Sequence, residues 1–409
     1  MKLFQKLLIA PAALGLFSPI AAIANEINLD DVSGYSSAEE VQNINEFNAK
    51  ELAVTNSRVD GLEARLNNFE AGSFSETTTL SGSAHFQIGA TDGSATTEAI
   101  TSTYAYDLDL NTSFTGEDNL YVGIEAGNGV FGTVDFVTDN SNAQGDGLQI
   151  DSLYYAFPLG EYEVAVGPKL DNDDFMPTST SKYSDRFLMS GQGMTSANFS
   201  WDLGVTGSGF AVARTFDNGW NASASLIGLS ASTSSGLLTK EGNDVITLSA
   251  GYDGENYGLG LVYVDADEAC TFYTGLSTCS NNSWSSIEAN TWTLGGYWTP
   301  NDGKTTLSAT YGTISVDVTG TTTDDINEFH FGVDHSIGNG VLSAAIKSSE
   351  FWASNGNADP LGEFAEIYYT YDVNDSMELT GGFSFAMPDN AGTTWVDRTA
   401  VGLEATFKF

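Results

Sequence analysis

From residue 78 to the C-terminus, apolar and polar residues alternate with a period of two. Side chains on a β-strand point alternately to opposite faces, so each alternating run has one apolar face and one polar face. We count about sixteen runs, each of about ten residues, an even number of the kind that a closed bacterial barrel requires. The runs are residues 79–90, 104–114, 120–126, 149–157, 161–170, 209–216, 220–229, 245–252, 257–266, 290–299, 305–316, 328–337, 341–351, 363–373, 377–387 and 397–409.

The connections between these runs alternate in length. Asp-Asn-Gly at 217–219, Gly-Asn-Gly at 338–340 and Asn-Asp at 374–375 suit tight hairpins, whereas the intervening connections are long and polar. Short turns at one end and long loops at the other are typical of an outer-membrane barrel with periplasmic turns and external loops. We therefore expect an all-β fold, a transmembrane antiparallel β-barrel, over residues 73–409.

Alternation alone does not separate a membrane barrel from a soluble β-sandwich, whose apolar face points inward. The aromatic residues favour the membrane barrel, because tyrosine and tryptophan gather near strand ends, where girdles at the two membrane interfaces lie. These residues are Tyr257, Tyr263, Trp292, Trp298, Tyr369 and Tyr371. In that case the apolar face meets outer-membrane lipid, and the interior is polar and water-filled without a packed core. Arg214 breaks the pattern, because it falls on the same strand face as the apolar residues Phe210 and Phe216. Either a bulge or a position near a strand end would explain it.

A long, turn-rich and charged stretch, residues 171–195, follows the alternating hairpin of residues 152–170. Loops of this length without secondary structure of their own are uncommon and usually functional. We expect this loop to fold into the lumen as a constriction. The candidate selectivity residues are Asp171, Asp173, Asp174 and Asp185 opposed to Lys182, Arg186 and Arg398. The candidate lumen-wall residues are Asp107, Asp109, Glu161, Glu163, Lys169 and Glu404. The alternative for each is a solvated lumen side chain with no selective role.

The first 72 residues differ from the rest. Lys2 and Lys6 precede an apolar run over 7–17, and Ala22-Ile23-Ala24 supplies a cleavage site, so residues 1–24 are expected to be a signal peptide. A retained anchor is the alternative, but the run is shorter than the ~20 apolar residues of a spanning helix. Within the segment 25–72, residues 36–70 show roughly four to five heptads, which predicts a periplasmic coiled coil. A single amphipathic helix lying against the barrel is the other interpretation.

The charge balance is strongly acidic, with 14 Lys+Arg against 54 Asp+Glu and a net charge of −40. Removal of the leader takes away Lys2 and Lys6 and no acid, which leaves −42. Such a chain repels nucleic acid, and acids on inward faces predict a preference for cations. Self-repulsion of this size also favours a salty medium, where charges are screened.

Few residues of the chain suit catalysis or metal binding. Cys270 and Cys279 lie in a polar stretch, and in an exported chain a disulfide is the expected pairing, with free thiols as the alternative. Two thiols without a nearby histidine do not complete a zinc site. The only histidines are His85, His330 and His335, and no serine stands beside them in a recognisable catalytic motif. We expect no enzyme activity, no cofactor and no metal.

Residues 50–82 (KELAVTNSRVDGLEARLNNFEAGSFSETTTLSG), the hairpin SLYYAFPLG at 152–160 and the terminal Phe409 resemble the outer-membrane porins of marine cyanobacteria, some of which are labelled iron-uptake or carbohydrate-selective porins. The resemblance implies insertion by the barrel-assembly machinery and assembly as a homotrimer. It also implies that the loop after the fifth strand, here residues 171–195, is the constriction loop. Family members usually carry a surface-layer homology domain before the helix, and residues 25–48 leave no room for one, so the resemblance does not extend to anchoring in the cell wall.

The function predicted from the sequence is passive diffusion of small hydrophilic solutes and ions, including iron or other inorganic nutrients, through a water-filled pore. The pore is expected in the outer membrane of a Gram-negative-type bacterium, and the resemblance implies a marine cyanobacterium. The rival hypothesis is a structural barrel that tethers the envelope through its N-terminal helix and conducts little. Electrical conductance separates the two hypotheses, because a plugged barrel passes no current.

Overall fold

The computed structural model describes residues 77–92, 100–128, 135–136, 147–171, 174–183, 187–188, 206–229, 231–232, 236–239, 244–267, 287–300, 303–318, 324–352, 358–387 and 398–409. The chain divides into two compact units, Met1–Ser73 and Phe74–Phe409, and every described residue belongs to the second. The expected signal peptide, the expected coiled coil and both cysteines lie outside the described residues. Within the described ranges, no helix has the length and apolar character needed to cross a membrane.

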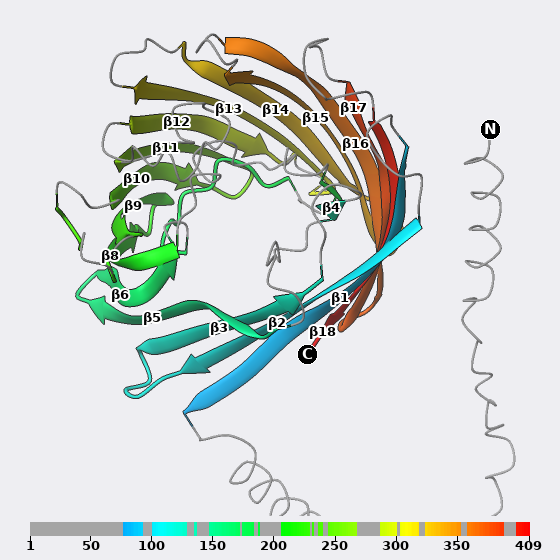
Figure 1. Cartoon of the computed structure of the whole chain (residues 1–409). Coiled ribbons are helices and arrows are strands. Elements are labelled where there is room, and N and C mark those ends of the chain that lie inside the picture. The colour runs from blue at the N-terminus through cyan, green and yellow to red at the C-terminus, as the bar shows by residue number, and fades with distance from the viewer. Residues whose placement is uncertain are drawn as a thin grey trace, which may run out of the picture. The chain divides into compact units, whose positions relative to one another are not determined.

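Sixteen antiparallel strands close into a barrel, which confirms the predicted fold (Figure 1). The first strand pairs with the last, from Ser83 opposite Lys408 to Asp92 opposite Thr399. The barrel strands are β1 (Thr78–Asp92), β2 (Ile100–Thr112), β3 (Asn119–Gly127), β5 (Gln149–Leu159), β6 (Tyr162–Asp171), β8 (Thr206–Thr215), β9 (Trp220–Gly228), β10 (Asp244–Asp253), β11 (Tyr257–Asp267), β12 (Ile287–Trp298), β13 (Thr305–Val318), β14 (Ile326–Ser336), β15 (Gly340–Trp352), β16 (Ala358–Asn374), β17 (Met377–Met387) and β18 (Arg398–Lys408).

Two further strands, β4 (Asp135–Phe136) and β7 (Phe187–Leu188), pair with each other and are not part of the barrel wall. β7 comes from the loop after β6 and lies beside β16 and β17. This pair is not predictable from the sequence, because a run of two residues is too short to show a period.

The outer face of the barrel is apolar. In β10 the alternation is clear, because Ile246 and Leu248 are exposed while Thr247 and Ser249, which point inward, are buried. Other strands follow the same rule and expose large apolar side chains outward, among them Phe86, Ile88, Leu259, Leu261, Leu294, Phe331, Ile346, Ile367, Phe383 and Leu403. Apolar side chains exposed around the whole wall are what a lipid-facing barrel needs, and water would penalise them.

Aromatic side chains gather at the strand ends that the short turns connect. Trp220 at the start of β9 packs against Tyr252 at the end of β10, with ring centroids 5.7 Å apart, and Tyr252 packs against Tyr257 at 5.4 Å. Trp298 ends β12 on the same side and is exposed. This row has the position of an interfacial aromatic girdle.

The exception to the alternation, Arg214, has its explanation at this end of the barrel. Its guanidinium forms an ion pair with Glu161 in the β5–β6 turn. It also stacks over the rings of Phe216, at 4.3 Å, and Tyr162, at 5.2 Å. Arg214 is therefore tolerated because it sits next to the strand end, where its charge reaches a carboxylate.

The turn between β2 and β3 is organised by Asp118. Its Oδ1 accepts hydrogen bonds from Ser113 Oγ at 2.9 Å and from the N–H groups of Phe114 and Thr115 at 2.9 and 2.8 Å. Its Oδ2 accepts a hydrogen bond from the hydroxyl of Tyr155 at 2.6 Å. The Tyr155 bond first, and then the Thr115 and Ser113 bonds, hold the pKa of the Asp118 carboxyl well below its usual range.

We expect Asp118→Ala to lower the urea midpoint of unfolding at neutral pH, since it removes the acceptor of this turn. The depressed pKa sets the pH dependence. Stabilisation by the carboxylate is complete above the ordinary aspartate pKa of about 4 and is lost as the pH falls toward the folded-state value. The midpoint difference between the wild type and Asp118→Asn, measured from pH 2 to pH 7, should therefore widen up to about pH 4 and then level off. A difference independent of pH would show that the carboxylate charge plays no part.

The inner face has two unlike sides, and this differs from the expectation of an interior without a packed core. Along β9 to β14, a group of apolar side chains points inward toward the long-loop ends and is buried. They include Ile227, Val245, Val262, Val264, Ile314 and Ile326, which form one cluster with Leu170, Phe175 and Met176. Along β2, β3 and β6, the inward positions include the acidic residues Asp107, Asp109, Glu125 and Glu163, which are at least partly exposed. The apolar cluster is shielded from water, whereas the carboxylates of the acidic side remain at least partly exposed.

A candidate constriction site on the inner wall

The segment 174–183, from the loop after β6, runs along the inner wall of the barrel (Figure 1). At its start, the ring of Phe175 meets that of Tyr154 on β5 edge-on at 5.1 Å. Further on, Thr178 Oγ1 lies 2.8 Å from both Asn221 Oδ1 on β9 and Ser249 Oγ on β10. The segment then crosses β11 to β14 and reaches β16 through Tyr183. This path places a lumen-folded loop where the sequence analysis expected one.

Glycines on the inner face let the segment approach the wall this closely. A Cβ at Gly260 would lie 2.7 Å from the carbonyl oxygen of Ser179, and one at Gly295 would lie 2.3 Å from the carbonyl oxygen of Thr180. A Cβ at Gly332 would lie 2.5 Å from the ring of Tyr183. No side chain fits at these distances, so the three inward glycines on β11, β12 and β14 define the track of the segment.

The far end of the segment is anchored by Tyr183. Its side chain is buried, and its hydroxyl donates a hydrogen bond of 2.5 Å to Glu366 Oε1 on β16. Its ring packs against His330 at 5.2 Å and against Tyr368 at 6.3 Å. Burial, and then the charge of Glu366, raise the pKa of the Tyr183 hydroxyl far above its usual range. The hydroxyl therefore keeps its proton and stays a donor.

Beside this anchor lies a buried ion pair. Lys347 Nζ on β15 is 2.9 Å from Glu328 Oε1 on β14, and each side chain is 3% exposed. His330, between them and Tyr183, is also fully buried, and within the described residues neither of its ring nitrogens has a hydrogen-bond partner. A lysine and a glutamate this deeply buried depend on each other, because an unpaired charge at such a position is strongly destabilising.

Of the seven predicted selectivity residues, the structure describes the side chains of Asp171, Asp174 and Lys182, which lie in different surroundings. Lys182 turns to the wall, where its Nζ is 3.2 Å from Asp253 and 4.1 Å from the centroid of the Tyr297 ring. Asp171 ends β6 and accepts a hydrogen bond of 2.8 Å from Thr206 Oγ1. Asp174 is exposed to the lumen. The remaining predicted residues lie beyond what the structure describes: Asp173, Asp185, Arg186 and the side chain of Arg398.

Asp174 belongs to an acidic wall that continues onto β2. Asp107 and Asp109 point inward from β2, where Asp107 accepts a bond of 2.9 Å from Ser83 Oγ and Asp109 one of 2.6 Å from the Tyr121 hydroxyl. Although Asp174 is open to lumen water, protein atoms displace much of the solvent around it. This burial, and then the charges of Asp171 and Asp151, raise the pKa of Asp174 to about 7.

The predicted wall residues are in four different situations. Glu163 faces inward, and Glu161 lies in the turn with Arg214. Glu404 faces inward on β18 but is 3% exposed and accepts hydrogen bonds from Gln87 Nε2 at 2.7 Å and Thr406 Oγ1 at 2.8 Å, so it is committed to the wall. The prediction that Lys169 lines the lumen is wrong. A register shift between Gly167 and Leu170 reverses the alternation, which places Lys169 opposite Leu153 on the outer face.

One polar cluster escaped the sequence analysis. His85 Nε2 lies 2.8 Å from Ser83 Oγ, and His85 Nδ1 lies 3.4 Å from Glu404 Oε1. The Ser83 hydroxyl donates to Asp107, so its proton is directed away from the imidazole, unlike that of an activated nucleophile. Ser83, His85 and Gln87 share one strand face and could have been grouped from the sequence. Glu404 could not, because it joins them only through closure of the barrel.

Comparisons with known proteins agree with this geometry. No protein-family model matches the chain. An uncharacterised protein of Nostoc sp. (strain PCC 7120), alr4550, is 27% identical over 90% of this chain and 72% of its own length. An anion-selective porin from Comamonas acidovorans superposes with a TM-score of 0.56 at 15% identity, over 81% of this chain and 99% of that porin. A loop L8 deletion mutant of OmpT, an outer-membrane protein of Vibrio cholerae, superposes with a TM-score of 0.55 at 12% identity, over 82% of this chain and all of that one.

The fold is therefore that of the outer-membrane porins. Identities this low establish the architecture of the barrel and leave the chemistry of its interior to be argued from this chain's own residues.

Proposed function

We propose that this protein is an outer-membrane porin through which small hydrophilic solutes and ions diffuse passively, with a preference for cations. The observation that carries the proposal is a closed barrel with an apolar outer face, an acidic inner wall and a loop segment lying inside it. A barrel of about sixteen strands leaves an aqueous channel. The apolar outer face supports placement in a lipid bilayer, where a charged outward face would be costly.

The pore lies along the acidic side of the lumen, since the other side is covered. Inward carboxylates there include Asp107, Asp109, Glu163 and Asp174. Among the described residues, Lys182 is paired with Asp253 and Lys347 with Glu328, so neither lysine is available to balance them. Low-dielectric walls strengthen the field of such carboxylates, which raises the local concentration of cations and repels anions.

The finer parts of the proposal concern solute, assembly and habitat. An acidic pore suits inorganic cations, including iron, and the resemblance to marine cyanobacterial porins together with the Nostoc relative favours such an organism. One structurally similar protein, OmpT of Vibrio cholerae, is described in a trimer form, and we propose a homotrimer here, inserted by the barrel-assembly machinery. That chain superposes with a TM-score of 0.54 at 12% identity, over 82% of this chain.

Asp174 makes the cation preference dependent on pH. Because its pKa is about 7, the carboxylate is mostly charged at pH 8 and mostly neutral at pH 6. The ratio of cation to anion permeability should therefore fall as the pH is lowered through 7. In Asp174→Asn this step should disappear, and the ratio should stay near the low-pH value of the wild type. Reversal potentials recorded from pH 5 to pH 9 measure the effect, and an identical step in the variant would assign the titration to another group.

Reversal potentials in a potassium chloride gradient at pH 8 test the cation preference itself. The acidic wall predicts a reversal potential of the sign expected when potassium is more permeant than chloride. A potential of the sign set by chloride would contradict the electrostatic argument, even if the barrel conducts. The Comamonas porin shows that a barrel of this architecture also serves anions, so the sign of the selectivity is a real test.

A further inference from the structure

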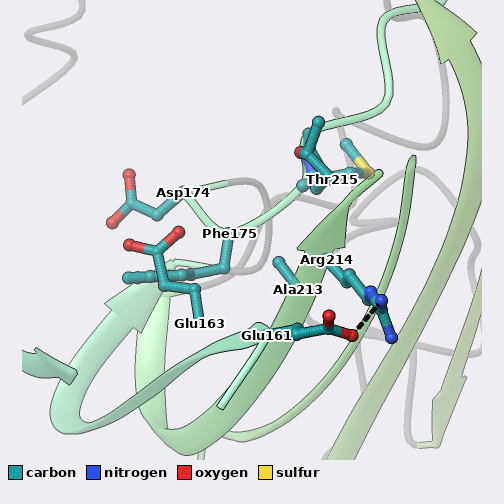
Figure 2. Close-up of a pocket in the computed structure, with 9 residues that line it drawn as sticks. Glu161, Glu163, Asp174, Phe175, Ala213, Arg214 and Thr215 are labelled. Atoms are coloured by element: carbon teal, nitrogen blue, oxygen red, sulfur yellow. Dashed lines mark hydrogen bonds and ion pairs between the residues drawn. The ribbon is translucent and has the colours of Figure 1, made fainter. Parts of the chain in front are cut away.

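A cavity of about 370 Å³ lies between the start of the loop segment and the barrel wall where the β5–β6 turn, the start of β6 and the end of β8 meet. Figure 2 shows it close up. The loop contributes Asp174, Phe175, Met176 and Pro177, and the wall contributes Glu161, Glu163, Ala213, Arg214 and Thr215. Because both the loop and the barrel wall form it, the cavity exists only while the segment is docked.

The lining of this cavity combines an apolar surface with uneven charge. Phe175 and Met176 are largely buried and supply a ring and a thioether. In Figure 2 the carboxyl groups of Asp174 and Glu163 lie on one side of the cavity, and the ion pair between Glu161 and Arg214 lies on the other. The charge of Arg214 is already balanced by Glu161, so Asp174 and Glu163 give the cavity its net negative charge.

We propose that this cavity binds a small organic ammonium ion, one positively charged amino group on a short apolar chain. The ammonium group would donate charge-assisted hydrogen bonds to the carboxylates of Glu163 and Asp174, and such bonds are stronger than neutral ones. The apolar chain would pack against Phe175 and Met176. The ammonium group also interacts favourably with the face of an aromatic ring such as that of Phe175, and the flexible thioether of Met176 can adapt to the ligand. The volume lies within the usual range of small-molecule sites, roughly 300–1,000 Å³.

The lining favours this class of ligand over two others. A bare inorganic cation would leave the apolar part of the cavity unused, and no cluster of three metal-ligating side chains occurs in the part of the chain that the structure describes. A small anion would meet two carboxylates and only the paired Arg214. The proposal rests on the proposed channel function, because the ligand reaches the cavity through the lumen, and it names a class of solute for that channel.

The probe for the experiment is n-butylammonium chloride, with 1-butanol as its uncharged analogue. Binding to the full chain in detergent micelles is measured by isothermal titration at pH 8, and block of the channel current by the same probes is measured in planar bilayers. The test variants are Glu163→Gln and Asp174→Asn. The control is Asp334→Asn, which neutralises a carboxylate on β14 that accepts a hydrogen bond from Ser343 and does not line the cavity.

Saturable binding of butylammonium is expected, with affinity reduced about tenfold in each test variant and unchanged in the control, and with no saturable binding of butanol. Equal affinity in Glu163→Gln, Asp174→Asn and wild type would overturn the proposal, as would butanol binding as well as the ammonium. A barrel that conducts potassium but does not bind butylammonium would refute the ammonium site and leave the channel intact. Binding of butylammonium in micelles without any conductance would support the ammonium site and contradict the channel.

Discussion

Replacing Lys347 by methionine is expected to lower the free energy of unfolding by about 3–5 kcal/mol, the largest stability loss that we predict for a single substitution. The reason is burial. The Lys347 and Glu328 side chains are each 3% exposed and 2.9 Å apart, so methionine fills the space but removes the charge that lies against the buried Glu328 carboxylate. Urea unfolding from detergent micelles, followed by tryptophan fluorescence, measures the loss.

The double variant Lys347→Met, Glu328→Gln is the control for this interpretation. It removes both charges and keeps polar atoms at position 328, so we expect it to recover most of the lost stability. If the double variant is as unstable as the single one, the loss comes from the packing of the lysine chain and not from a stranded charge.

Replacing Gly295 by valine is expected to displace the loop segment from the wall and to lower the single-channel conductance. A Cβ at this position would lie 2.3 Å from the carbonyl oxygen of Thr180, a backbone atom that moves only if the segment moves. The segment then shifts toward the lumen and narrows it. Overpacking of this kind typically costs about 1–3 kcal/mol, so the barrel should still fold. Conductance steps in planar bilayers measure the effect.

Gly147→Val is the matched control, because a Cβ at Gly147 would have no heavy atom within 4 Å. It introduces the same side chain without any clash and should conduct as the wild type does. A Gly295→Val channel with wild-type conductance would show that the segment does not limit the pore at this point.

The strand pattern and barrel closure were readable from the sequence because each strand faces lipid on one side. Lipid forces a strict alternation on every strand, and the tight turns mark the ends, as Asp217-Asn218-Gly219 does between β8 and β9. The inward direction of Asp107 and Asp109 follows from the same parity. Boundaries shifted by a few residues, since β2 begins at Ile100 and not at residue 104.

What the sequence analysis missed depends on contacts between distant segments. The register shift between Gly167 and Leu170 turned Lys169 outward, and a bulge has no period of its own by which it can be read. The glycine track under the loop segment joins three separate strands, so its meaning appears only once Thr180 and Tyr183 lie against it. The dry side of the lumen had a signal that was overlooked. Residues 259–264 (LGLVYV) are apolar on both faces, which is typical of a strand covered on both sides.

The most direct test of the account is the current through the purified full chain in a planar lipid bilayer. An open barrel with a wet acidic side predicts discrete, stable conductance steps that grow with the potassium chloride concentration. A chain that inserts as a folded barrel, shown by resistance to proteolysis in the same lipid, and yet passes no current would contradict the channel and favour the rival view of a plugged structural barrel.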